Sequence, residues 1–512
     1  MNAPAATPTA TQAPPAFGIR LGSGLFGILL AAIVAGLNNR VPSLLLADLQ
    51  GAFSLSSDKT SWLSTIYTAG ELSIMPFATW FAITFSLRRF HLMMLISTMV
   101  IACFLPFTSS YPLLLLMRAV QGITAGALIP MLMMSALRFL PPNIRLHGLA
   151  LYAMTATFAP NVALWVASLC MDSGNHWQWI YWHIIPLGAL AALLVYWGIP
   201  KMPLALPRIK QANWLGMLFG MPGLFFLAIT IDQGNHLDWW RSSVISATAL
   251  LGGVFLAIFV FTEWFHEAPF MRLQLLSRRN LGLGFILFLA LLVLMTTAVG
   301  LPANVLAHLH GFRAAQTDEI GLVVGLPQLI LGPLTSLLLY QKWVDARKVF
   351  ALGLLFMCAG IYCNTYLTDE WMANEFLLSA FFQAIGQPLA IIPLLFLATS
   401  VVQPMEGPSV SGIVNMLRGI GTLVGGAFIG HWSSNGAIQY ADTLQGASEQ
   451  AQSGINPVAS LVGVIAEQAS LLTTIDIYRF FALMAVVMVP FVLMLQYIPP
   501  PVVNAVPPHK PN

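Results

Sequence analysis

Four ionisable side chains stand inside apolar stretches that are long enough to cross a membrane, and they are Arg40, Glu71, Arg118 and Arg418. An ionised group is costly in a bilayer, so such residues face a protein interior or a water-filled cavity and mark transport pathways. A carboxyl group at that depth can bind and release a proton, whereas a guanidinium stays charged and can hold an anion. The residue types therefore indicate transport rather than bond-making chemistry.

The first three of these residues lie at similar depths. At a helical rise of about 1.5 Å per residue, Arg40 lies roughly 9–12 Å, Glu71 roughly 16 Å and Arg118 roughly 9 Å from the outer ends of their spans. We expect one network in which Glu71 lies within about 4 Å of a guanidinium and serves as the proton-coupling group. Two alternatives stay open: the arginine side chains extend to the outer interface, or Glu71 is a protonated carboxyl that is hydrogen-bonded between helices.

The segments that carry these residues are membrane spans by composition. Only 8% of the residues are charged and 58% are hydrophobic, whereas a soluble domain has about 25% charged residues. The apolar runs lack the alternation of barrel strands, so the sequence predicts an all-α polytopic membrane protein. Fourteen runs are long enough, at about 21–46, 60–84, 91–108, 112–137, 148–170, 179–199, 213–231, 243–264, 281–307, 319–340, 347–366, 374–399, 408–432 and 479–498.

The distribution of positive charge gives the orientation. With a cytoplasmic N-terminus, fifteen of the 22 Lys and Arg residues fall on the cytoplasmic side and four on the outer side. Cytoplasmic loops carry such an excess, and an even number of spans places both termini on that side. The Pro- and Ala-rich ends, residues 1–20 and 499–512, are predicted to be disordered cytoplasmic tails, and the first shows no cleavable signal peptide.

One connection is unusually long. Residues 433–478 are polar, contain no Lys or Arg, and lie on the outer face between the last two spans. We expect a loop that contains a short amphipathic helix after Pro457. Loops of this length are functional or disordered.

Enzymatic chemistry has no support in the motifs. The chain contains no phosphate-binding loop, no H-E-x-x-H and no G-x-S-x-G. Its four cysteines form no C-x-x-C pair. We therefore expect a protein that is not an enzyme, that holds no metal or cofactor and that binds no nucleic acid.

The fourth span contains the most specific motif, "RAVQGITAGALIP". Arg118 and Gln121 are three residues apart and share one helix face, while Gly122 and Gly126 permit close helix packing. The motif follows the pattern R-x-x-Q-G-x-x-x-G.

Together with this motif, "DSGNHWQWIYWHIIPLG", "PFMRLQLLSRRNLGLGF" and "NMLRGIGTLVGGAFIG" make the chain similar to the major facilitator superfamily, in its fourteen-helix drug:proton antiporter branch of EmrB-like permeases. The resemblance implies two six-helix bundles related by a pseudo-two-fold axis, at 21–200 and 281–498. It also implies a linker with two extra spans at 201–280, and a substrate site between the bundles near mid-membrane.

The chain departs from the family pattern at several places. The first span places Asn38 where the family carries an aspartate, and it adds Arg40. The cytoplasmic gating motif after the second span keeps only its basic end, Arg88 and Arg89. In the fifth span, alanines replace the glycines of the antiporter motif.

The resemblance implies an exporter in a bacterial inner membrane, coupled to protons through Glu71, that hands amphiphilic compounds to a periplasmic membrane-fusion adaptor and an outer-membrane channel. The gained arginine favours anionic or neutral substrates over cations. The predicted binding and charge network comprises Asn38, Asn39, Arg40, Arg118, Gln121, Asn415 and Arg418. An organic-anion symporter or uniporter, and a membrane scaffold or sensor without transport, remain as alternatives.

Overall fold

The computed structural model describes residues 17–141, 144–171, 176–403, 406–451 and 459–500. Within these ranges every regular element is an α-helix or a short 3-10 helix, so the all-α prediction is confirmed. A bilayer core offers the backbone no hydrogen-bond partners, and helices satisfy their own. The predicted tails, 1–20 and 499–512, lie almost entirely outside the described residues.

Thirteen of the described helical segments are long and apolar enough to cross a membrane. The helix that carries Glu71, α3 (Ser57–Thr84), is not among them, although its 28 residues exceed the roughly 20 that a crossing needs. Its hydroxyl groups and its carboxyl lower the hydropathy, but most of its residues are buried against protein. With α3, the described residues contain fourteen helical segments that are long enough to cross a membrane, which is the number that the sequence predicts.

The first six crossings pack on one another through contacts such as those of α3 with α5 and of α1 with α7 and α9. Helix α2 (Leu46–Phe53) connects the first crossing to the second. The crossings are α1 (Ile19–Leu44), α3, α4 (Leu87–Phe104), α5 (Tyr111–Gly126) with α6 (Leu128–Phe139), α7 (Arg145–Met171), and α8 (Trp179–Trp182) with α9 (Ile184–Gly198).

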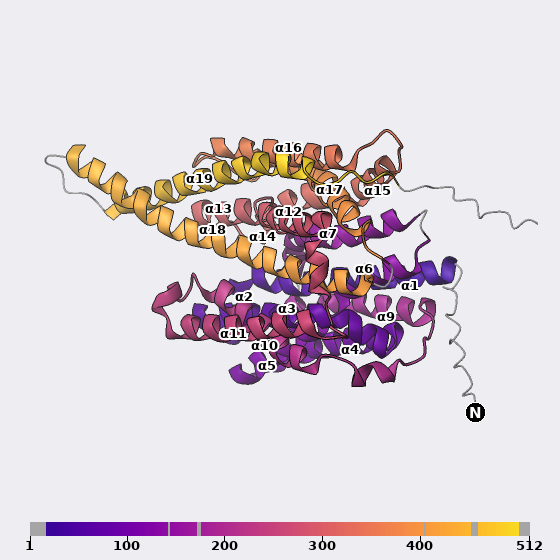
Figure 1. Ribbon diagram of the computed structural model, residues 1–512. Coiled ribbons are helices and arrows are strands. Elements are labelled where there is room, and N and C mark those ends of the chain that lie inside the picture. The colour runs from indigo at the N-terminus through magenta and orange to yellow at the C-terminus, as the bar shows by residue number, and fades with distance from the viewer. Residues whose placement is uncertain (1–16, 142–143, 172–175, 404–405, 452–458, 501–512) are drawn as a thin grey trace, which may run out of the picture.

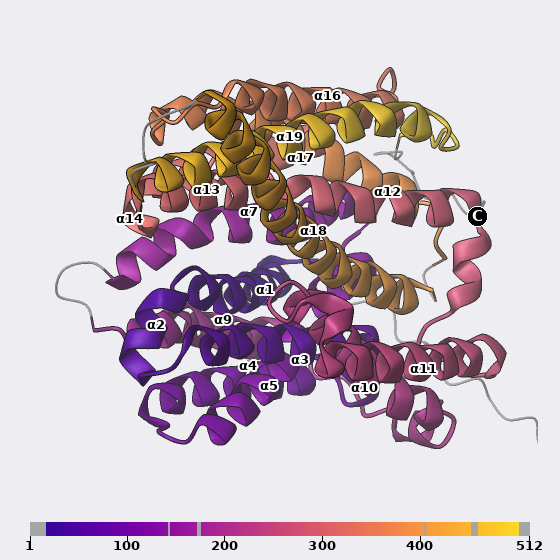
Figure 2. The same ribbon diagram turned by 90° about the vertical axis from the view of Figure 1, so that its left-hand side faces the viewer.

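The last six crossings form the second bundle, in which α16 packs on α17 and α19. They are α12 (Arg279–Met295) with α13 (Gly300–His310), α14 (Ala314–Gly325) with α15 (Gln328–Leu339), α16 (Ala346–Cys363), α17 (Leu377–Thr399), α18 (Gly407–Ala451) and α19 (Ala459–Leu493). Figure 2 shows the two groups of helices, with α18 running diagonally across the space between them.

The remaining two crossings, α10 (Trp214–Gln233) and α11 (Ser243–Phe265), pair with each other. Helix α10 packs on α3 of the first bundle and also contacts α18 of the second. At its start, the Asn213 side chain accepts a hydrogen bond from the Gly216 backbone N–H at 3.0 Å. Such a cap satisfies a donor that the first helical turn leaves free.

Glycines allow α3 and α5 to approach closely. A Cβ atom built on Gly122 would overlap the Tyr67 backbone carbonyl, one on Gly126 would lie 2.5 Å from the Glu71 carbonyl oxygen, and one on Gly70 would overlap the Ala119 carbonyl. The glycine spacing of the fourth span therefore fixes the position of α3, and with it the position of Glu71 and its neighbours, relative to α5.

The prediction of a loop over 433–478 is wrong for the described residues, although a helix does follow Pro457 as predicted, and residues 452–458 lie outside the described ranges. In the structure α18 continues for 45 residues to Ala451, and α19 begins at Ala459 and runs for 35 residues. Both helices project beyond the other helices (Figure 1), and we call this projection the hairpin. The Tyr440 hydroxyl donates to Asp476 Oδ2 at 2.5 Å, and Gly436 packs against Thr473. The polar composition of this segment predicts a loop, but it is equally compatible with helices that are surrounded by solvent.

The hairpin defines one side of the molecule, and α1 begins on the opposite side (Figure 1). We call these the hairpin side and the terminal side. On the terminal side the two bundles are in contact. Thr79 Oγ1 donates to the Pro408 carbonyl at 3.1 Å, and Ser411 Oγ donates to the Pro130 carbonyl at 2.8 Å.

We expect Gly122→Ala to lower the thermal unfolding midpoint of the purified protein, because the added methyl group forces α3 away from α5. Overpacking of this kind costs about 1–3 kcal/mol. The control is Gly253→Ala in the middle of α11, where an added Cβ meets nothing within 4 Å. Equal midpoints for the two variants, measured in the same detergent, would contradict the close packing.

Candidate functional site

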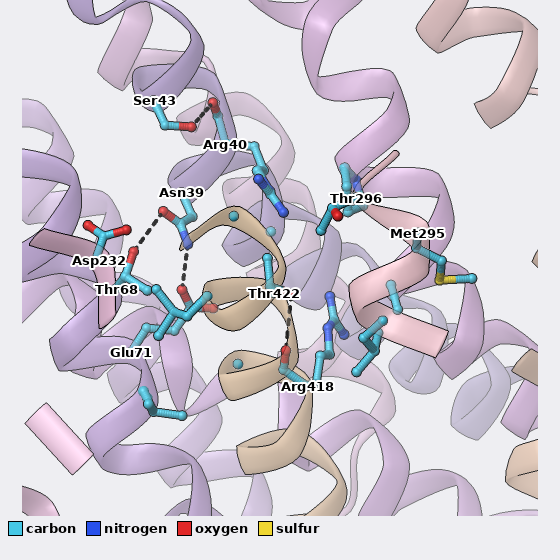
Figure 3. A pocket seen from close by; sticks show the side chains of 18 of the residues that line it. Asn39, Arg40, Ser43, Thr68, Glu71, Asp232, Met295, Thr296, Arg418 and Thr422 are labelled. Atoms are coloured by element: carbon cyan, nitrogen blue, oxygen red, sulfur yellow. Dashed lines mark hydrogen bonds between the residues drawn. The ribbon is translucent and has the colours of Figure 1, made fainter. Parts of the chain in front are cut away.

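A cavity of about 280 Å³ lies between the two bundles. It is lined from α1, α3, α7, α10, α12, α17 and α18, and Figure 3 shows that its polar side chains converge from both bundles. A second cavity of about 580 Å³ shares seven of its lining residues and continues to Ser434 and Ser470 of the hairpin helices. The site is therefore open toward the hairpin side, while the contacts described above close the terminal side.

Glu71 lies in the wall of this cavity, 8% exposed. Its Oε2 accepts a hydrogen bond from Asn39 Nδ2 at 2.8 Å, and the Thr68 hydroxyl donates to Asn39 Oδ1 at 3.5 Å. Asn39 thus orients the carboxyl group from the neighbouring helix (Figure 3). A carboxyl group that is held in a cavity reached by solvent is suited to bind and release a proton.

The predicted ion pair of Glu71 is wrong. The described residues contain three ion pairs, and none involves Glu71. Arg118 points into the first bundle, where it donates to Gln121 Oε1 at 2.7 Å and to the Leu63 carbonyl at 3.3 Å. Equal depth along the helices did not bring the charges together, because the side chains leave their helices in different directions.

Arg118 belongs to a separate buried network behind the cavity wall. Its guanidinium carbon lies 4.3 Å from the centre of the Tyr67 ring, a cation–π contact. Asn38 donates to the Tyr67 hydroxyl at 3.1 Å, and Gln121 donates to Asn38 Oδ1 at 3.4 Å. All four side chains are fully buried. Asn38, Arg118 and Gln121 therefore join α1, α3 and α5 and do not line the cavity.

Arg40 and Arg418 do line the cavity, from α1 and α18. Arg418 donates to the hydroxyl of Thr155 at 2.7 Å and to its backbone carbonyl at 2.6 Å. Neither guanidinium takes part in any of the three ion pairs of the described residues. Two positive charges from opposite bundles therefore face one space without a bound carboxylate, and they can hold an anionic group of a ligand.

Asn415, one helical turn before Arg418, lies on the closed terminal side. Its Oδ1 accepts a hydrogen bond from the Tyr152 hydroxyl at 3.0 Å, and its Nδ2 donates to the Ser411 carbonyl at 2.7 Å. Nearer the cavity, Asn161 Nδ2 donates to Gln387 Oε1 at 3.0 Å. Asn415 therefore joins the bundles beneath the cavity and is not one of its lining residues.

The predicted gate residues lie at the start of α4. The guanidinium of Arg88 stacks on the Tyr196 ring of α9 at 4.3 Å, and Arg89 is exposed. Neither arginine forms an ion pair in the described residues. The ion pair that lies between the start of α12 and the start of α18 joins Arg278 Nη2 to Glu406 Oε1 at 2.7 Å. The hydrogen bond from Arg278 holds the pKa of the Glu406 carboxyl below its usual value.

Sequence reasoning missed a second carboxylate. Asp232 of α10 lines the same cavity as Glu71. The seventh apolar run ends at residue 231, so the sequence predicts that Asp232 lies in a loop, but α10 continues to Gln233. The signal in the sequence was the pair Asp232 and Gln233, which follows directly on an apolar run.

Comparisons with known proteins agree with this architecture. The sequence matches the Major Facilitator Superfamily over residues 28–295 and 283–447. It is 23% identical over 503 residues to the fatty acid resistance protein FarB of Neisseria gonorrhoeae, covering 94% of this chain and 97% of FarB. It is 23% identical over 417 residues to the multidrug export protein EmrB of Escherichia coli (strain K12), covering 81% of this chain and 80% of EmrB.

Among solved structures, the human organic anion transporter MFSD10 shares the fold, with a TM-score of 0.55 at 12% identity over 91% of this chain and 99% of that one. The family match covers most of the chain, and the two bundles enclose a central cavity that is open to one side. The chain belongs to the Major Facilitator Superfamily.

Proposed function

We propose that the protein is a secondary exporter of amphiphilic compounds, coupled to the proton gradient, with anionic and neutral substrates preferred over cations. The observation that carries this proposal is the central cavity, in which Glu71 faces the same space as the guanidinium groups of Arg40 and Arg418. The export and resistance functions in the names of EmrB and FarB support the direction of transport.

Glu71 is the proposed proton-binding group. Its carboxyl has one bonded side-chain neighbour, Asn39, and the cavity gives it access from the hairpin side. Addition of a proton changes the net charge of the cavity by one unit. The occupancies of proton and substrate are then linked, because each alters the free energy of binding the other.

The two arginines are the proposed sites for an anionic headgroup. They project from opposite bundles, so a ligand that touches both is held only while the bundles are suitably spaced. Apolar cavity residues such as Leu72, Met75 and Met295 suit the hydrocarbon part of an amphiphile. When the cavity carboxyl groups are protonated, a lipophilic cation would approach two positive charges that nothing balances, where screening is weak.

The same arginines favour a second candidate, an organic-anion symporter or uniporter. The two candidates differ in the direction of proton movement. Flux of lauric acid, a fatty acid chosen as an anionic amphiphile, is measured in proteoliposomes under an imposed pH gradient of either sign. The flux through protein-free liposomes, in which protonated lauric acid crosses the lipid with its proton, is subtracted, and the remaining flux distinguishes the candidates. Antiport gives uptake against an opposing proton flow, symport gives flow in the same direction, and uniport gives flux without dependence on the gradient.

We propose a bacterial inner membrane as the location, with the terminal side in the cytoplasm and the hairpin in the periplasm. The excess of Lys and Arg near the terminal side supports this orientation. The hairpin would then present its helices to a periplasmic adaptor and an outer-membrane channel. The proposed division of the chain has bundles at 21–200 and 281–498 around a linker at 201–280, and the pairing of α10 with α11 supports it.

We expect Glu71→Gln to abolish gradient-driven transport and to preserve folding and substrate binding. The amide keeps the size and a hydrogen-bonding group but cannot exchange a proton. The matched control is Glu267→Gln, an exposed residue between α11 and α12. Flux in proteoliposomes reads out coupling, and tryptophan quenching by laurate reads out binding. Transport by Glu71→Gln that still follows the pH gradient would remove Glu71 from the mechanism.

We expect Arg40→Gln and Arg418→Gln each to weaken laurate binding by about tenfold to a hundredfold. A hydrogen bond to a charged group is worth about 1.5–3 kcal/mol, and about 1.4 kcal/mol is a factor of ten. Binding of dodecanol, which has the same chain without the charge, should change little. The control variant is Arg241→Gln, at an exposed position outside the cavity. Equal losses for laurate and dodecanol would refute a charge-specific role.

We expect replacement of residues 445–466, which include the outer end of α18 and the start of α19, by a short Gly/Ser linker to abolish export from whole cells and to spare laurate binding by the purified protein. The deletion leaves the contact of Tyr440 with Asp476 in place, so the spans should pack normally. A control chain keeps the length but has this segment replaced by an unrelated helical hairpin. Undiminished export by the deletion strain would argue against docking of an adaptor at this segment.

A further inference from the structure

Asp232 is a second cavity carboxylate, and it comes from the linker pair rather than from either bundle. It is the penultimate residue of α10 and lines the cavity with Arg40, Glu71 and Arg418. Figure 3 shows it beside Thr68 and Asn39. Like Glu71, it takes part in none of the three ion pairs of the described residues. The Asp232 carboxyl therefore shares the cavity with positive charges but is not fixed to any of them by an ion pair within 4 Å.

Its hydrogen bonds suit both protonation states. Thr65 Oγ1 lies 2.5 Å from Asp232 Oδ2, 3.1 Å from the Ser61 carbonyl and 2.6 Å from Gln233 Nε2, which donates to it. A hydroxyl has one proton to give and two lone pairs to accept with. When Asp232 is ionised, Thr65 donates to it; when Asp232 is protonated, it donates to Thr65, whose proton turns to Ser61.

The charged surroundings come from several elements. Arg40 of α1, Glu71 of α3 and Arg418 of α18 face the same cavity, and His236, just beyond α10, acts on Asp232 electrostatically. The neighbouring helix α11 brings no charge near: Thr248 bonds to Thr230, and Glu263 bonds to Asn213 at the far end of α10. His431 of α18 is engaged with Trp239.

We infer that Asp232 is a second proton-binding group of the transport cavity, so that the linker helix α10 takes part in coupling as well as joining the bundles. This inference rests on the proposed proton-coupled transport and deepens it. With Glu71 and Asp232 ionised, their two negative charges balance those of Arg40 and Arg418. Each proton that binds then leaves one positive charge unbalanced, so the cavity can take up to two protons in a cycle.

The test compares Asp232→Asn with Asp238→Asn in the full-length protein. Asp238 is exposed and lies six residues further along the chain, and its backbone φ of 56° is one that asparagine tolerates. Infrared difference spectra between acid and alkaline conditions, in lipid nanodiscs without substrate, report the carbonyl stretch of each carboxyl group that takes up a proton.

We expect Asp232→Asn to lose one component of this band, and Glu71→Gln to lose a different one. Thr65→Val keeps the volume of the side chain but removes its hydroxyl group, so it should shift the frequency of the Asp232 component. The component that belongs to Asp238, which Asp238→Asn removes, should stay unchanged in Thr65→Val. This variant also serves if Asp232→Asn fails to fold. A difference spectrum that neither Asp232→Asn nor Thr65→Val alters would overturn the inference.

A second measurement separates this inference from the proposed function. The number of protons that cross per laurate in proteoliposomes should fall in Asp232→Asn and stay at the wild-type value in Asp238→Asn. Absence of laurate transport by the wild type, with the Asp232 component still present in the infrared spectrum, would reject the proposed function and keep the proton site. An unchanged proton-to-laurate ratio in Asp232→Asn would exclude Asp232 from coupling.

Discussion

The cost of placing charge away from water organises this molecule. Each ionised group at membrane depth needs polar partners or access to solvent, and the chain meets this requirement in two ways. Arg118 is enclosed by Gln121, a backbone carbonyl and the face of Tyr67. Arg40 and Arg418 instead face a cavity that reaches the hairpin side. The first arrangement fixes the structure of a bundle, and the second leaves charge available to a ligand.

Helix α3 connects these two arrangements. One of its faces meets α5 across the glycines Gly70, Gly122 and Gly126, and there Tyr67 joins the enclosed network. Another face presents Thr68 and Glu71 to the cavity. A third meets α10, where Thr65 bonds to Asp232. After Lys59, no position on α3 is exposed, which explains how a helix with this many polar groups can cross a membrane.

The sequence predicted the all-helical fold, the number of crossings and four of the cavity residues: Asn39, Arg40, Glu71 and Arg418. It misplaced Arg118 because depth along a helix was estimated without direction around it. The adjacent residues Asn38 and Asn39 show how much the direction around the helix matters, because Asn38 is enclosed in the bundle and Asn39 lines the cavity. Asp232 and the hairpin were missed because polar residues at the end of a span read as loop, although the helix continues.

The continuity of α18 has a mechanical consequence. The helix makes several contacts with the first bundle, and one of them is at Gly412, where an added Cβ would meet the Pro76 carbonyl at 3.0 Å. From that contact Arg418 lies about 9 Å along the axis and Ala451 about 58 Å, at the usual helical rise. A tilt of α18 about Gly412 that moves the guanidinium slightly therefore swings the outer tip roughly six times as far. If α18 tilts as a rigid body, it acts as a lever arm, and a small displacement at the cavity becomes a larger displacement at the outer ends of the hairpin helices.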